Sequence, residues 1–117
     1  MISDEKILDD FGKLLIKEVF DNQYKFILNN IQDLSNTEEY KNLFSGMTLI
    51  QKKEIENYTK ELLKGSLFDF LKIFEENDKY KLIFEDNNNQ TDINKISEML
   101  KAEPIIEDGW IDRFSEF

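Results

Sequence analysis

The sequence predicts a mainly α fold, a single-domain helical bundle of about five to seven helices with a short β-strand or hairpin near residues 80–92. Apolar residues recur every three or four positions through most of the chain. Residue types that begin helices precede several of these runs, and one short segment alternates with period two. With 117 residues and 40% hydrophobic content, the chain is long enough to bury one core. We therefore expect one domain, residues 1–117.

The first predicted helix begins at Ser3, whose hydroxyl can accept a hydrogen bond from an amide of the first turn. Its apolar positions are Ile7, Leu8, Phe11, Leu14, Leu15 and Val19. A second apolar run covers residues 20–34, but its phase shifts at Asp21–Asn22. This pattern fits either a second helix or a bent continuation of the first. We expect a bend or short break at Asp21–Asn22.

Turn and capping residues mark the next two helices. Thr37 can cap a short helix that Ser45–Gly46 then ends. Thr48 and Gln51 have the spacing of a capping box, in which each side chain satisfies a backbone amide of the other residue. A longer helix should start there. Gly65–Ser66 is expected to interrupt or kink it.

The segment after this interruption is predicted to be the most buried helix. Residues 67–74 are apolar around most of the helix circumference. Ser66 and Asp69 offer a second, weaker capping arrangement for this segment. We therefore place the centre of the core here.

The apolar period then changes from helical to alternating. Tyr80, Leu82 and Phe84 alternate with polar or outward-facing positions, which predicts a strand. Asn87–Asn89 follows as a turn that tolerates left-handed backbone, and a returning strand is expected near residues 90–92. A lone hairpin is marginally stable in water, so this one should pack against the helices.

The same region resembles a calcium-binding loop in its alternation but not in its details. Oxygen-bearing side chains stand at every second position, namely Asp86, Asn88, Gln90 and Asp92. A calcium loop needs glycine at the sixth position and glutamate at the twelfth, where this chain has Thr91 and Ser97. We expect a hairpin turn and no metal here.

The last quarter of the chain contains short elements and an aromatic end. Asp92 or Thr91 can cap a short helix that Pro104 closes, and a last turn of helix should follow Asp108–Gly109. The apolar residues of this last turn are Trp110, Ile111, Phe114 and Phe117. They fit either a buried anchor for the chain end or an exposed docking patch, and anchoring is favoured. Arg113 is expected to bind a carboxylate through both arms of its guanidinium.

Composition restricts the chemistry that the protein can perform. The chain has no histidine and no cysteine, and 25 Asp and Glu exceed 15 Lys and Arg, for a net charge of −10. The commonest general base, transition-metal ligand and strong nucleophile are therefore absent. We expect no enzymatic activity and no cofactor.

The expected location is cytoplasmic. The acidic start lacks the pattern of a signal peptide, no run of 18 apolar residues indicates a membrane span, and the absence of cysteine fits a reducing compartment. Negative charge also disfavours nucleic acids and anionic lipids, so we expect no nucleic-acid partner and no membrane partner. A basic protein is the expected kind of partner.

Two segments resemble the tail of small uncharacterised bacterial proteins, residues 91–97 and residues 108–115, which contain a Gly-Trp-Ile and a Phe-Ser pattern. The whole chain, small, acidic and mainly helical, is also similar in kind to bacterial immunity proteins. This resemblance implies an inhibitor whose acidic face binds a basic toxin. No family site can be assigned to particular residues from it.

The sequence favours two functional hypotheses over a third, an enzyme or metal protein that would use carboxylates alone. The first is a partner-binding protein, an immunity or antitoxin-like inhibitor of a basic toxin. Its candidate partner-binding residues are Asp108, Trp110, Asp112 and Glu116, together with Glu75, Glu76 and Asp78. The second is a structural or adaptor module that self-associates as a homo-oligomer through its aromatic C-terminal end.

Overall fold

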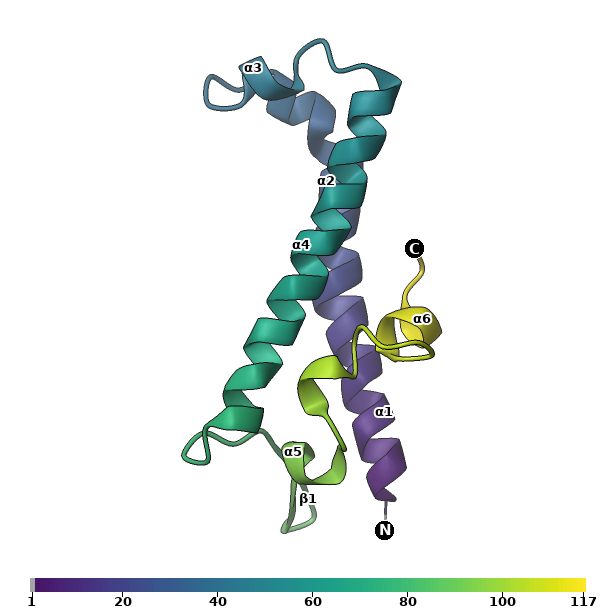
Figure 1. Ribbon diagram of the computed structural model, residues 1–117, viewed down its shortest axis with the longest axis vertical. Coiled ribbons are helices and arrows are strands. Elements are labelled where there is room, and N and C mark those ends of the chain that lie inside the picture. The colour runs from purple at the N-terminus through teal and green to yellow at the C-terminus, as the bar shows by residue number, and fades with distance from the viewer. Residues whose placement is uncertain (1) are drawn as a thin grey trace.

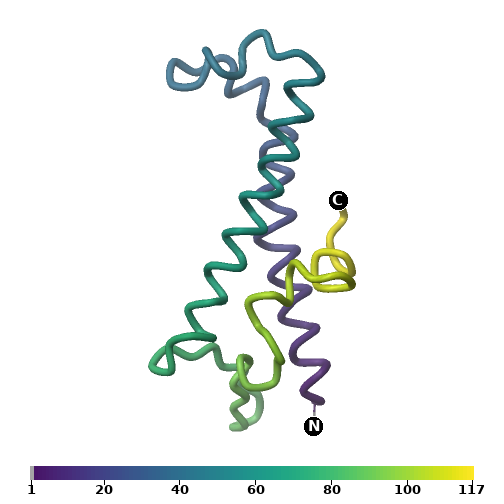
Figure 2. Tube along the Cα trace, viewed as in Figure 1, coloured from purple at the N-terminus to yellow at the C-terminus, as the bar shows by residue number. Residues whose placement is uncertain are grey.

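The computed structural model describes residues 2–117, and Met1 of the predicted 1–117 domain lies outside the described residues. The molecule is elongated, with extents of 54 × 27 × 25 Å (Figure 1). Two long helical rods run antiparallel along the long axis, as the trace in Figure 2 shows; residues 41–44 form a short helix at one end, and the hairpin and the C-terminal elements lie towards the other. The chain is mainly helical and contains a short hairpin, as predicted. Two of the interruptions that the sequence predicted do not occur, so the separate helical segments among residues 2–117 are slightly fewer than expected.

The first rod consists of α1 (Asp4–Leu15), a π-helical segment η1 (Ile16–Asp21) and α2 (Asn22–Ser35). Ser3 caps α1 as predicted, since its Oγ accepts a hydrogen bond from the amide of Lys6 at 3.1 Å.

The predicted short break at Asp21–Asn22 is wrong, because both residues keep helical backbone angles. The alternative of a continuing helix is confirmed. A π-helical turn contains more residues than an α-helical turn, which explains why the apolar phase shifts without a break.

The second rod is α4 (Leu49–Glu76), a single helix of 28 residues. The Thr48–Gln51 capping box at its start is confirmed by both of its hydrogen bonds. Between the rods, Thr37 caps a turn that leads into α3 (Lys41–Phe44). Despite the length of α4, no helix within residues 2–117 combines the length and the apolar character needed to cross a membrane.

The predicted interruption at Gly65–Ser66 is wrong. Ser66 does not cap a new helix, because its hydroxyl donates to the carbonyl of Leu62 in the preceding turn. A glycine inside a helix costs only about 1 kcal/mol relative to alanine, and the capping box and packing of the rest of α4 offset that cost.

The segment 67–74 is also not the central buried helix that its composition predicted. Leu67 and Leu71 are buried, whereas Phe70 and Ile73 are nearly half exposed. Only one side of α4 is covered, because the first rod and the C-terminal elements all pack on that side.

The hairpin is confirmed, but its first strand begins later than predicted, at Ile83, so Tyr80 and Leu82 lie outside it. Strands β1 (Ile83–Asp86) and β2 (Asn89–Asp92) are antiparallel, with Phe84 opposite Thr91. Asn87 and Asn88 both have positive φ, 48° and 69°, as a two-residue type I′ turn requires. The segment that alternates like a calcium loop is therefore divided between two strands.

Three short helical elements follow the hairpin: α5 (Ile93–Ile96), the 3₁₀ turn η2 (Leu100–Ala102) and α6 (Trp110–Phe114). Asp92 caps α5 as expected, because its carboxylate accepts from the amide of Asn94. The single helix expected before Pro104 is divided in two, since Ser97 has extended backbone angles.

Trp110 is at the centre of the core. Its side chain is 0% exposed and packs in a cluster with residues of both rods, and the edge of its ring system meets Phe11 at 5.7 Å between centroids. The indole also lies directly against Gly12 of α1, where a Cβ would collide with it. The other buried cluster members are Ile7, Ile16, Phe20, Leu67, Leu71, Ile93 and Leu100.

The molecule has two parts that differ in how many elements pack together, and the main core lies in only one of them. In the base, residues 2–21 and 65–117, the hairpin and C-terminal elements add a third layer to the rods. The arm, residues 22–64, has only α2 and the first half of α4, with α3 at its end. Its buried apolar side chains are Tyr24, Ile31 and Phe44.

The Gly12 contact predicts that alanine will destabilise the protein at a helical position where alanine is intrinsically better than glycine. We expect Gly12→Ala to cost about 1–3 kcal/mol in the free energy of unfolding, because the indole must move. Gly65→Ala is the matched control: it lies inside α4 with open space around it and should gain about 0.5–1 kcal/mol. Urea unfolding measures both, and a stabilising Gly12→Ala would contradict the packing described here.

Candidate functional site

The negative charge of the protein belongs entirely to the base. The arm contains six lysines and six carboxylates, so its net charge is zero. The base contains nine basic residues and nineteen carboxylates, which account for the whole net charge of −10. This separation depends on the fold, because the base joins two segments that are distant in the sequence.

A group of carboxylates surrounds α6, where the C-terminal segment packs on α1. We call this group the acidic face: Asp9, Glu98, Glu103, Glu107, Asp108 and Asp112. Arg113 lies within it and binds Asp9 of α1 at 3.1 Å. Six carboxylates on these packed segments outnumber the one guanidinium, which gives an excess of negative charge.

Arg113 forms the ion pair that the sequence predicted, but with different geometry. A single N–H donates to Asp9, so the two-armed contact is not formed. The guanidinium also lies over the ring of Phe114, 4.7 Å from its centroid. The pair joins α6 to α1 across 104 residues of sequence.

Glu103 reports the electrostatics of this face. Burial raises the pKa of the Glu103 carboxyl above its ordinary value, the Arg113 guanidinium opposes this rise, and the charges of Asp9 and Glu98 add to it. Ionised Glu103 is therefore disfavoured in the folded state, although a cation lies nearby.

The predicted residues of the C-terminal group have different environments. Trp110 is in the core and no partner can reach it in this fold. Asp112 accepts a hydrogen bond from the amide of Asp108 at 2.9 Å, which closes the turn before α6. Glu116 pairs with Lys25 of α2 at 3.1 Å. Asp108 and Asp112 thus remain on the acidic face, whereas Glu116 ties the chain end to the arm.

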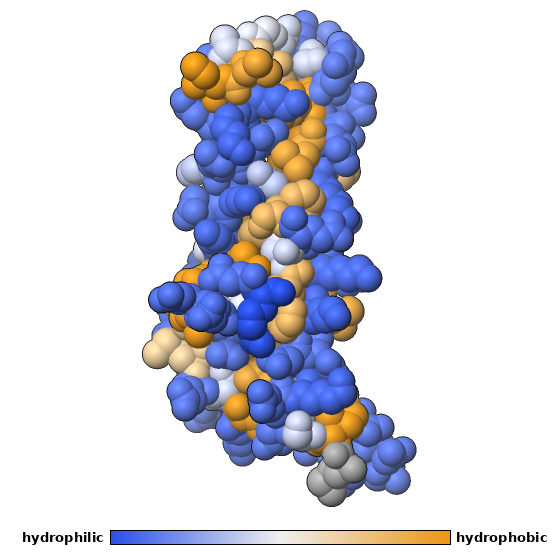
Figure 3. Space-filling model, turned by 90° about the vertical axis from the view of Figure 1, so that its right-hand side faces the viewer, coloured by the Kyte–Doolittle hydropathy of each residue, from blue (hydrophilic) through white to orange (hydrophobic). Residues whose placement is uncertain are grey.

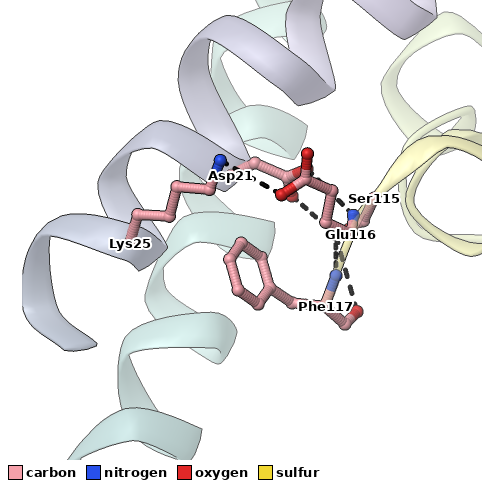
Figure 4. A network of polar contacts seen from close by, with 5 residues as sticks. All are labelled: Asp21, Lys25, Ser115, Glu116 and Phe117. Atoms are coloured by element: carbon pink, nitrogen blue, oxygen red, sulfur yellow. Dashed lines mark hydrogen bonds and ion pairs between the residues drawn. The ribbon is translucent and has the colours of Figure 1, made fainter. Parts of the chain in front are cut away.

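Asp21 holds this chain end in place and was missed by the sequence analysis. It is 3% exposed and accepts hydrogen bonds from Ser115 Oγ at 2.6 Å and from the Glu116 amide at 3.0 Å (Figure 4). The ring of Phe117 packs edge-on against Tyr24, 5.0 Å between centroids. One signal for this role was present in the sequence: Asp21 directly follows the apolar residue Phe20. Both residues are buried in the structure.

The second predicted group, at the end of α4, is partly neutralised. Lys101 of η2 lies 3.3 Å from both Glu75 and Glu76, and hydrogen bonds with these two carboxylates raise the pKa of the Lys101 ammonium. Asp78 lies on the surface. Within residues 2–117, no hydrogen bond or ion pair joins this group to the acidic face, and no three carboxylates converge as metal ligands.

Comparison with known proteins gives no relative for this chain: no family model, no curated protein and no solved structure matches it. The chemistry of the acidic face is therefore the available guide to what the base does. Its carboxylates can accept hydrogen bonds and ion pairs from lysine and arginine side chains of another molecule.

We expect Asp21→Ala to weaken the attachment of the chain end. Two hydrogen bonds to a carboxylate are lost and the Glu116 amide is left without that partner, so stability should fall by about 1.5–3 kcal/mol. Glu18→Ala, which removes an exposed carboxylate from the same rod, should change stability by less than about 0.5 kcal/mol. Equal changes in the free energy of unfolding for the two substitutions, measured in urea, would show that the Asp21 hydrogen bonds do not stabilise the fold.

Glu103→Gln should stabilise the protein at neutral pH. The folded state raises the pKa of Glu103, so it binds more protons than the unfolded chain, and stability falls as pH rises through the interval above the ordinary glutamate pKa. Removing the charge should raise Tm by about 1–3 °C at pH 7. The gain should vanish at pH 3, where the carboxyl is protonated in both the folded and the unfolded state. A gain that persists unchanged at pH 3 would exclude the electrostatic cause.

Proposed function

We propose that the protein binds a basic protein through its acidic face, as an immunity or antitoxin-like inhibitor of a basic toxin. The observation that supports this function is the concentration of the entire net charge of −10 in the base, where the Arg113–Asp9 ion pair joins α6 to α1. The proposal involves no catalytic step and no cofactor, and it assigns the protein to the cytoplasm.

The loop between η2 and α6 also offers apolar contact area, with Ile105 next to Phe68 of α4 and Ile106 next to Gly109. Ile105 and Ile106 are 42% and 46% exposed and stand between Glu103 and Glu107 in the sequence. Exposed apolar side chains within a charged rim have the composition of a binding site, since the apolar centre supplies energy and the rim supplies orientation. A partner with lysine or arginine around an apolar depression fits this pattern.

The structure changes the set of residues that we assign to the partner. Asp108 and Asp112 remain from the first predicted group, with Glu107 beside them. Trp110 acts from the core by holding α6 against α1. Glu75, Glu76 and Asp78 form a secondary acidic area that Lys101 partly neutralises.

The aromatic C-terminal end supports the alternative function, a structural or adaptor module. Phe117 is 41% exposed although its ring contacts Tyr24, so part of it is open to another molecule. A module of this kind would self-associate there without catalysis, and its association would change little with salt.

The function is tested with the wild-type protein as bait in a lysate of the source organism, washed at low and then high salt. We expect one basic protein to be retained at low salt. Measured with that purified protein, the association rate of the combined variant Glu107→Gln and Asp108→Asn should fall at least about fivefold and depend less on salt. Asn tolerates the positive φ of 57° at position 108, so the turn should persist.

The matched control is the combined variant Glu54→Gln and Glu61→Gln, which removes the same charge from the arm. It should bind like the wild type. If both variants bind equally, or if no basic protein is retained at low salt, the acidic face is not the binding site and the proposed function is wrong.

A further inference from the structure

The free end of the arm exposes four large apolar side chains, which we call the tip: Tyr40, Leu43, Leu49 and Ile50. Leu49 and Ile50 are 86% and 73% exposed, the largest values among the exposed apolar residues of the described chain. Phe44 is buried beneath this end of the arm. Figure 3 shows apolar side chains gathered at this end of the molecule.

The exposed side chains of the tip are not needed to start or cap the helices of the arm. The capping box begins α4 through Thr48 and Gln51, and neither Leu49 nor Ile50 takes part in it. Single exposed leucines are ordinary, but four large apolar residues within eleven positions at one end of a molecule form a patch. Such patches are typical of surfaces that another molecule covers.

Charge decides which kind of molecule fits. The arm has no net charge, whereas the base is strongly negative. A strongly basic partner would therefore be attracted to the base and not to the tip. A second copy of the chain is repelled everywhere on the base and not at the tip. With a long axis of 54 Å, copies that meet at their tips keep their acidic bases many Debye lengths apart, since that length is about 8 Å at physiological salt.

Charges of both signs lie beside the tip. Glu38 and Glu39 precede α3, where Glu38 pairs with Lys41 of the same chain at 3.0 Å, and Lys52 and Lys53 lie in the first turns of α4. A two-fold axis brings the same patch of both copies together, so carboxylates of one tip can meet lysines of the other.

We propose that a second copy of this chain docks on the tip, forming an end-to-end dimer with two-fold symmetry. Four exposed apolar side chains and the polar residues around them make a small contact surface, at or below the lower limit of about 600 Å² per copy for specific interfaces. The dimer is therefore weak, with a dissociation constant on the order of micromolar. This inference does not depend on the proposed function, since it concerns the opposite end of the molecule.

Sedimentation velocity of the full chain, from about 1 to 500 µM at physiological salt, tests the dimer. We expect concentration-dependent dimers of the wild type, and a dissociation constant at least about tenfold weaker for the combined variant Leu49→Lys and Ile50→Lys. Lysine is a good helix former and both positions are exposed, so the fold should persist, which circular dichroism checks. Small-angle scattering should give the dimer a maximum dimension near twice the length of one copy.

The matched control is the combined variant Phe26→Lys and Leu62→Lys, which adds the same charge at exposed apolar positions along the arm. It should dimerise like the wild type. A monomeric wild type at 500 µM, or equal dimerisation by the tip variant, overturns the proposal. A dimer lost instead on Phe117→Ala overturns it in favour of the C-terminal end. Monomers that cosediment with phosphatidylglycerol vesicles, and lose this property in the tip variant, overturn it in favour of a lipid surface.

Discussion

The contact between Trp110 and Gly12 is the constraint on which the rest of the structure depends. The indole can lie flat against α1 only because position 12 has no Cβ, and this contact brings residues 98 apart in the sequence into one core. Burial of an aromatic side chain of this size stabilises the fold by about 2–3 kcal/mol or more. It outweighs the absence of a hydrogen-bond partner for Trp110 Nε1 among residues 2–117. Asp9 with Arg113, and Asp21 with the chain end, then fix the direction in which α6 leaves the core.

The difference between base and arm follows from this anchoring. Where the C-terminal elements cover one side of the two rods, the apolar residues on that side are buried, whereas Phe70 and Ile73 of α4 stay nearly half exposed. The arm has only two helices, and two helices cannot bury both of their apolar sides. The arm therefore retains exposed apolar residues. Its charges are also balanced, whereas the base carries a strong net negative charge around its core. The two ends of the molecule therefore differ in net charge and in apolar exposure.

The candidate site was predictable only in part. Sequence analysis identified Asp108 and Asp112 and the pairing of Arg113, because turn residues and a lone arginine are recognisable without coordinates. It did not identify Asp9, Glu103 or Asp21. Each of these carboxylates looks like an ordinary surface residue, and its role depends on a segment about 90 to 100 residues away along the chain that folding brings to it.

The sequence by itself determined the features that depend on hydrogen bonds between near neighbours: the Ser3 cap, the Thr48–Gln51 capping box and the asparagine turn of the hairpin. Tertiary structure decided whether a helix ended at residues that weaken it locally. The helix continues through Asp21–Asn22 by way of a π-helical turn, and it continues through Gly65 because packing of the adjacent turns exceeds the cost of a glycine, about 1 kcal/mol. It also decided exposure, since residues 67–74 are apolar on most sides but only one side has a neighbour. A residue's hydrophobicity is a property of its side chain, whereas its burial depends on which other segments reach it.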